Sequence, residues 1–186
     1  MRGSLVALGL AAVACGGSGS GNPADSIQAM EAVAHDISSA TDTYGAQAAG
    51  MADVTACASD EASHDAQVRP MVERMQGLSP GMDGMMGSLG DRAEADMTCA
   101  ADAMMYELDR HQGVACSSPA DMGPNKAEAA QHVENMTKWA DHQTVRASDL
   151  ASMVGMGGRG GGMGGGMGGG TTGHCVHNSD GSYSME

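Results

Sequence analysis

Acidic residues stand four positions before a histidine at four places in this chain. The pairs are Glu31/His35, Asp60/His64, Glu107/His111 and Glu128/His132. Glu61 adds a further acid three positions before His64. Both spacings place a carboxylate and an imidazole on one face of a helix. The simplest interpretation is pairing on helix surfaces, which stabilises a helix by about a few tenths of a kcal/mol.

The position of some of these residues indicates more than surface pairing. In each segment the apolar residues form one stripe along the predicted helix, which we call its seam. The seams include Glu61, His64 and His111, and His132 lies beside the seam of its own segment. At a rise of about 1.5 Å per residue, their distances from the neighbouring turns put His64, His111 and His132 within about two helical turns of the same end of the bundle. Tyr44, on the seam of the first segment, belongs at the same end. The histidine of the first pair lies on a flank and is left out.

A buried carboxylate among imidazoles is costly unless something compensates, and a metal ion is the usual compensation. Carboxylate and imidazole together suit copper, zinc or iron. The candidate metal ligands are Tyr44, Glu61, His64, Glu107, His111, Glu128 and His132. A hydrogen-bonded polar layer without a metal is the alternative.

The run Glu61-Ala62-Ser63-His64 resembles one Glu-x-x-His motif of the ferritin-like di-iron bundles. That family uses two such motifs and two further Glu residues. Here the second motif is missing, because Glu107 and His111 have the wider spacing. The resemblance therefore leaves a di-metal redox enzyme as the third possibility.

Four segments carry apolar residues at steps of three and four, as amphipathic helices do. The predicted helices cover residues 23–50, 57–89, 91–114 and 124–154. Pro70 is expected to kink the second helix or to start a new one, and Pro80 to end or bend it, which leaves 82–90 as a looser piece. Helices joined by short turns favour an all-α fold, an antiparallel up-down four-helix bundle over residues 23–154.

The last part of the chain differs in composition. Residues 155–173 form a Gly/Met-rich linker, and residues 174–186 are expected to be a short docked tail. Thioether and imidazole ligands in this region resemble copper- or silver-handling sequences of envelope proteins. A secondary metal site is therefore expected among Met156, Met163, Met167, His174 and His177.

Cysteine spacing predicts two disulfides. In an up-down bundle the start of the second helix and the end of the third are neighbours, so Cys57 should pair with Cys116. Cys99 lies near the other end, where Cys175 can pin the tail to the bundle. A free Cys175 thiol is the alternative. The chain has no CxxC spacing, so a zinc cage of that type is not indicated.

The N-terminus predicts export and anchoring. A basic start, a short apolar run and small residues describe a signal peptide over residues 1–14. The run Ala12-Val13-Ala14-Cys15 resembles a bacterial lipobox, which implies a lipid on Cys15 and a tether over residues 15–22. Under that resemblance the protein lies in the bacterial cell envelope, held by its lipid to the outer membrane and facing the periplasm.

The composition limits the classes of binding partner that we expect. The chain has 9 Lys and Arg against 23 Asp and Glu, a net charge of -14, and loss of Arg2 with the signal makes it one charge more negative. Nucleic acid is not expected as a partner, because its phosphates need basic residues. Cations suit such a surface. With 18 Met and no Phe, the core must be built from Ala and Met.

These observations favour a non-enzymatic metal-binding role for an envelope lipoprotein, with copper first and zinc or iron as alternatives. The rival hypothesis is a structural or interaction lipoprotein without a metal. No GxSxG elbow is present, and no nucleophile is indicated. The sequence names no protein partner.

Overall fold

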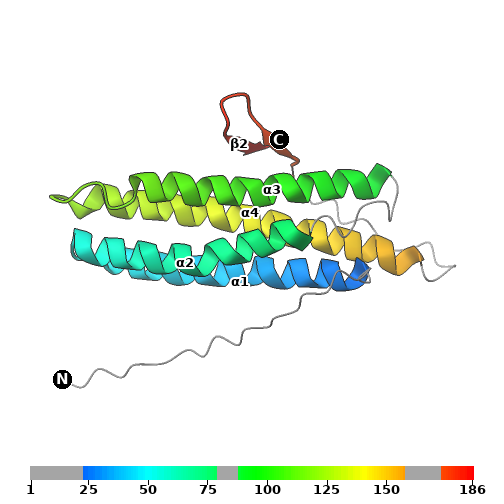
Figure 1. Cartoon of the computed structure of the whole chain (residues 1–186), viewed down its shortest axis with the longest axis horizontal. Helices are drawn as coiled ribbons and strands as arrows, with labels where there is room; N and C mark the ends of the chain where they lie inside the picture. The colour runs from blue at the N-terminus through cyan, green and yellow to red at the C-terminus, as the bar shows by residue number, and fades with distance from the viewer. Residues whose placement is uncertain (1–22, 79–87, 158–172) are drawn as a thin grey trace, which may run out of the picture.

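The computed structural model describes residues 23–78, 88–157 and 173–186 (Figure 1). Within these ranges the chain forms four α-helices and a small antiparallel sheet. The elements are α1 (Pro23–Gly50), α2 (Val54–Leu78), α3 (Ser88–Val114), α4 (Met122–Gly157), β1 (Cys175–His177) and β2 (Tyr183–Met185). The predicted signal peptide, lipidated Cys15 and tether lie outside the described residues.

The helices form the predicted bundle. α1 packs against α2 and α4, and α3 packs against the same two helices. The four helices therefore form a ring in which each helix has two neighbours. Figure 1 shows the turn between α1 and α2 at the same end of the bundle as the turn between α3 and α4. The prediction of an antiparallel up-down four-helix bundle is confirmed.

Polar caps explain why two helices begin earlier than expected. Asp53 Oδ1 accepts hydrogen bonds from the backbone N–H of Thr55 and of Ala56, so α2 starts before Cys57. Asp121 Oδ1 accepts one from the N–H of Gly123 and caps α4 ahead of Pro124. At the other end, α4 continues to Gly157, into the stretch predicted as linker.

Pro70 lies inside α2 without ending it. The expectation that a new helix starts there is wrong. The ring lies on the exposed face of the helix, where water can satisfy the carbonyl that loses its N–H partner. The looser piece predicted at 82–90 lies mostly outside the described residues.

The core is made of small and flexible side chains, as the composition predicts. Its middle section combines Ala residues with Met75, Met104 and Met136. Trp139, which the seam places at the bundle edge, belongs to this central cluster with only 6% of its surface exposed. A separate cluster around Tyr44 and Met51 fills the end where α1 and α2 meet.

Two disulfides connect these elements. Cys57 pairs with Cys116, and Cys99 pairs with Cys175, as the topology predicts. The second bond ties the sheet to α3, and β1 packs on that helix (Figure 1). In the sheet, Cys175 is directly opposite Met185. Among the described residues, no helix combines the length and the hydropathy needed to cross a bilayer.

Candidate metal centre

Three histidines and a tyrosine meet inside the bundle at the end closed by Cys57–Cys116. His64 Nε2 of α2 lies 3.0 Å from His132 Nε2 of α4. The His132 ring stacks on that of His111 from α3, with centroids 4.0 Å apart. Tyr44 of α1 stacks on His64 and places its hydroxyl 2.8 Å from His111 Nε2. All four helices thus contribute one ring to a buried cluster.

Carboxylates bind the outer nitrogen of two of these rings, and they do so across helices. Glu107 Oε1 of α3 lies 3.2 Å from His132 Nδ1 of α4. Glu128 Oε1 of α4 lies 3.3 Å from His111 Nδ1 of α3. The interpretation of these acids as partners of the histidine four residues further along their own helix is therefore wrong. The acids exchange partners, which ties α3 to α4.

Arg110 connects the two carboxylates. It donates from Nε to Glu107 Oε2 at 3.0 Å and from Nη2 to Glu107 Oε1 at 2.7 Å. The same Nη2 lies 2.7 Å from Glu128 Oε1. Burial opposes ionisation of Glu107, but His132 and Arg110 outweigh it and lower its pKa to about 2. Both carboxylates therefore act as acceptors at neutral pH.

This arrangement orients the rings. Because Glu107 accepts, His132 donates its Nδ1 proton to it, and in the neutral ring Nε2 then carries a lone pair that faces the centre of the cluster. His111 lies between two carboxylates, with Glu128 at Nδ1 and Glu61 at Nε2, so either of its nitrogens can donate. A carboxylate on the outer nitrogen of a histidine is also the usual support of a metal-bound imidazole, because it orients the ring and increases its basicity.

Glu61 faces the same centre. Its Oε2 lies 2.8 Å from His111 Nε2. Nevertheless, this buried oxygen has no aligned hydrogen bond from any described residue. His64 Nδ1 is likewise buried and without a hydrogen-bond partner in the described structure. A carboxylate oxygen and a nitrogen lone pair at this separation repel each other, so the contact needs either a proton on His111 Nε2 or a metal ion between the two atoms.

The pKa directions agree with this picture. Burial, aided by the charge on His132, lowers the pKa of His64 to about 4. Burial also lowers the pKa of His132, against the opposing effect of Glu107. For His111, burial is outweighed by Glu61 and Glu128, and its pKa is raised. A proton on His111 is thus one way to relieve the contact with Glu61, and a metal ion would be another.

A surface pocket of about 350 Å³ leads to this cluster between α2 and α3. Glu61 and Asp65 line it from α2, and Gln112 lines it from α3. Its wall at the bundle end includes Cys116 of the disulfide. Its two carboxylates attract cations, so the pocket offers an entry path to Glu61.

No group of three or more His, Cys, Asp or Glu side chains in the described ranges is arranged so that it could hold a metal ion as it stands. The inner atoms instead form two contacting pairs, His64–His132 and His111–Glu61, which are joined by the stacked rings. Glu107 and Glu128, predicted as ligands, lie outside the rings and face Arg110. They support imidazoles and do not face the centre.

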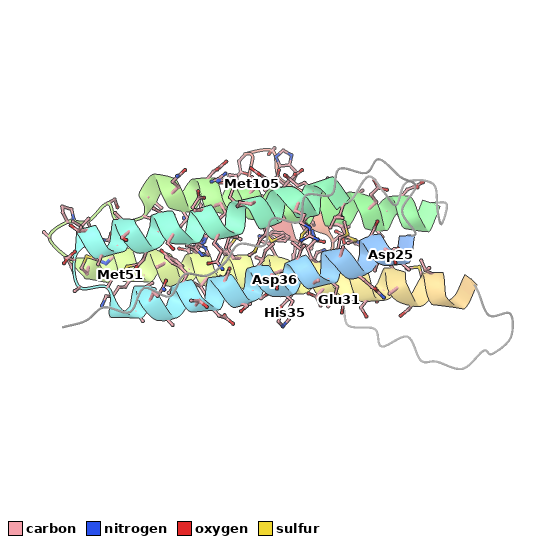
Figure 2. The ribbon with its side chains drawn as sticks, turned by 60° about the horizontal axis from the view of Figure 1, so that its bottom comes forward. Asp25, Glu31, His35, Asp36, Met51 and Met105 are labelled. Carbon is pink, nitrogen blue, oxygen red and sulfur yellow. A yellow bond between two sulfur atoms is a disulfide. The ribbon has the colours of Figure 1, made fainter. Side chains whose placement is uncertain are left out.

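The remaining predicted residues are dispersed. His174 Nδ1 lies 3.4 Å from Arg146 Nη2, and His177 stacks on Tyr183, so the two tail histidines have different neighbours. Met163 and Met167 lie outside the described residues, as does the side chain of Met156. His35, on α1, points away from the bundle (Figure 2) and is exposed.

The sequence did not predict a fourth buried histidine, His142. His142 Nε2 of α4 lies 3.0 Å from Asp96 Oδ2 of α3. Asp96 also accepts from Arg146 Nε at 2.5 Å and from the Cys175 N–H at 2.6 Å. No acid precedes His142 by three or four residues, so the spacing used above could not find it. Gln143, a polar residue on the α4 seam, was the available signal of a polar site there.

Comparison with known proteins adds no relative. No family model, no curated protein and no solved structure matches this chain significantly. Arguments about function therefore depend on the geometry of the cluster.

Proposed function

We propose that this protein is a non-enzymatic metal-binding lipoprotein whose bundle holds one transition-metal ion. The ligands are His64, His111, His132 and Glu61, with Tyr44 beside them. The observation that carries the proposal is the 2.8 Å approach of His111 Nε2 to a buried Glu61 oxygen that has no aligned hydrogen bond from the described residues.

The separations between these atoms suit a common ion. Two ligands with bonds of about 2.0–2.1 Å to the same metal lie about 2.9–3.4 Å apart, depending on the angle between them. The His64–His132 nitrogens are 3.0 Å apart, and His111 and Glu61 are just below this range at 2.8 Å. Binding requires the two pairs to close on one centre by a movement of their side chains.

Copper is the favoured ion. Three imidazoles and a carboxylate suit Cu(II), Zn(II) and Fe(II), and copper binds such ligands most tightly of the three. A di-metal redox centre is disfavoured, because Glu107 and Glu128 are occupied by Arg110 and by the Nδ1 atoms of two histidines. The rival proposal, a structural lipoprotein, treats the same residues as a polar layer.

The test is metal binding by matched histidine variants. Purified protein without a His-tag is challenged separately with Cu(II), Zn(II) and Fe(II), and bound metal is measured by elemental analysis. We expect about one metal per chain in the wild type and in His35→Gln, and loss in His64→Gln/His132→Gln. Nitrogen hyperfine coupling in the electron paramagnetic resonance spectrum of the Cu(II) form should decrease in His64→Gln and in His132→Gln. Absence of binding would support the structural alternative, whereas binding that survives the double variant would overturn this site and place the metal elsewhere in the chain.

We infer further that the protein is anchored through Cys15 in the bacterial envelope. Its support is the lipobox-like run and the presence of two disulfides, which persist in oxidising compartments. Growth with labelled palmitate should label the wild type and not Cys15→Ser. The wild type should be found in the outer-membrane fraction, and Cys15→Ser should be absent from it. Palmitate label on Cys15→Ser would contradict the anchor.

A further inference from the structure

One ring nitrogen of His142 is hydrogen-bonded, and the other has no hydrogen-bond partner among the described residues. Asp96 accepts hydrogen bonds from Arg146 and from the Cys175 N–H, so its side chain acts as an acceptor. The proton shared with His142 therefore belongs to His142 Nε2. The neutral ring then carries its lone pair on Nδ1. That atom is buried and has no hydrogen-bond partner among the described residues. The His142 residue as a whole is 2% exposed.

The same ring lines a surface pocket of about 480 Å³ between α4 and the tail. Met185 of β2 forms the wall on the tail side, and Val145 adds apolar surface. Thr137 also lines the pocket, and its Oγ1 is a second buried oxygen without a hydrogen-bond partner in the described parts of the chain. At the rim, Glu134 and Asp141 outweigh Lys138 by one negative charge.

Two connections hold Met185 beside His142. The Cys175 N–H and His142 Nε2 bind the two oxygens of the same Asp96 carboxylate. Met185 is the cross-strand partner of Cys175, which is itself bonded to Cys99 of α3. The disulfide therefore fixes Met185 at the pocket that His142 also lines.

We propose that His142 and Met185 form a second metal site, selective for a soft monovalent ion, Cu(I) or Ag(I). Thioether sulfur favours soft ions, and a neutral imidazole nitrogen binds them as well. The oriented imidazole has the same carboxylate support as a metal-bound histidine. Asp96 is occupied by its three donors, so the two ligands proposed here are a thioether and a neutral imidazole. Burial lowers the pKa of His142, which keeps the ring neutral.

This site is separate from the cluster of His64, His111 and His132 and does not depend on it. It also differs from the tail site expected from the sequence, because neither His174 nor His177 lines this pocket. A ligand here would bridge α4 and β2. Binding should therefore hold the tail more firmly against the bundle.

The test uses Ag(I), which has no redox chemistry under these conditions, and full-length oxidised protein labelled at its methionine methyl groups. The Met185 resonance is assigned from Met185→Leu. We expect one equivalent of Ag(I) to shift it in the wild type, in Met153→Leu and in His64→Gln/His132→Gln. His142→Gln, which can still donate to Asp96, should abolish the shift.

Affinity for Cu(I) gives a second readout that does not depend on the histidine variant folding. In anaerobic competition with a chelator, Met185→Leu should bind at least tenfold more weakly than Met153→Leu, a matched change at an exposed methionine of α4. A Met185 resonance that stays unmoved while other methionines shift would overturn the proposal. Equal Cu(I) affinity of the two methionine variants would overturn it as well.

Discussion

Arg110 is the residue on which the cluster depends most, although it contacts neither Tyr44 nor any imidazole nitrogen described above. Its guanidinium binds Glu107, which is almost fully buried, and Glu128. Each of these carboxylates orients one histidine. One cation thus holds the two carboxylates that position two rings on two different helices.

Replacement of Arg110 by Met should destabilise the metal-free protein by about 2–4 kcal/mol, because it leaves Glu107 buried without its cation. The free energy of unfolding from urea denaturation measures this. Arg69→Met is the matched control. Its partners Asp65 and Asp109 are 19% and 64% exposed, so neither is buried as Glu107 is, and we expect a loss of about 1 kcal/mol or less. Equal losses in the two variants would contradict the role assigned to Arg110.

His64 should make the metal-free protein less stable in acid. Its folded pKa of about 4 lies below the ordinary value of 6.5, so its stabilising contribution is complete above pH 6.5 and is lost as the pH falls towards 4. His111, with a raised pKa, acts in the opposite direction. In His64→Gln, the slope of unfolding free energy against pH should decrease by up to about 1.4 kcal/mol per pH unit.

Urea denaturation at pH 7, 5.5 and 4.5 measures that slope. His35→Gln is the control, because the His35 ring is exposed and its removal should leave the slope of the wild type. A His64→Gln slope equal to that of the wild type would show that His64 is solvated in the native protein.

At the scale of elements, the tail depends on its disulfide. Two strands of three residues each are too small to be stable alone. In Cys99→Ser/Cys175→Ser we expect the amides of residues 174–186 to lose protection from hydrogen exchange, while α1 to α4 remain folded. Cys57→Ser/Cys116→Ser should instead lower the stability of the whole bundle, by about 4 kcal/mol in the loop-entropy model. A protected tail in the first variant would show that Asp96 and Arg146 suffice to hold it.

The helices could be predicted because their signal is local. Apolar residues spaced three and four positions apart defined the seam of each helix. The up-down order of the helices then placed Cys57 near Cys116. The exchange of partners between Glu107 and Glu128 could not be predicted, because it depends on the rotation of α3 and α4 about their axes. His142 was missed for a related reason, since its partner Asp96 is on another helix, 46 positions away.

At the scale of the whole molecule, the dominant feature is charge. With 23 acidic residues against 9 basic ones, like charges repel over much of the surface. Added salt screens this repulsion, so the midpoint of thermal unfolding should rise between about 10 and 200 mM NaCl. A potassium chloride series followed by circular dichroism serves as a check that the effect is general. A falling midpoint would mean that ion pairs such as Arg110–Glu107 dominate.

The two disulfides also overlap along the chain, because Cys99 lies between Cys57 and Cys116. Every peptide bond from Cys57 to Cys175 is therefore part of a covalent ring. A protease that cuts once anywhere in this interval releases no fragment. A nicked molecule should migrate as one band on a non-reducing gel and as two after reduction, so the oxidised protein survives a single cleavage with all its parts attached.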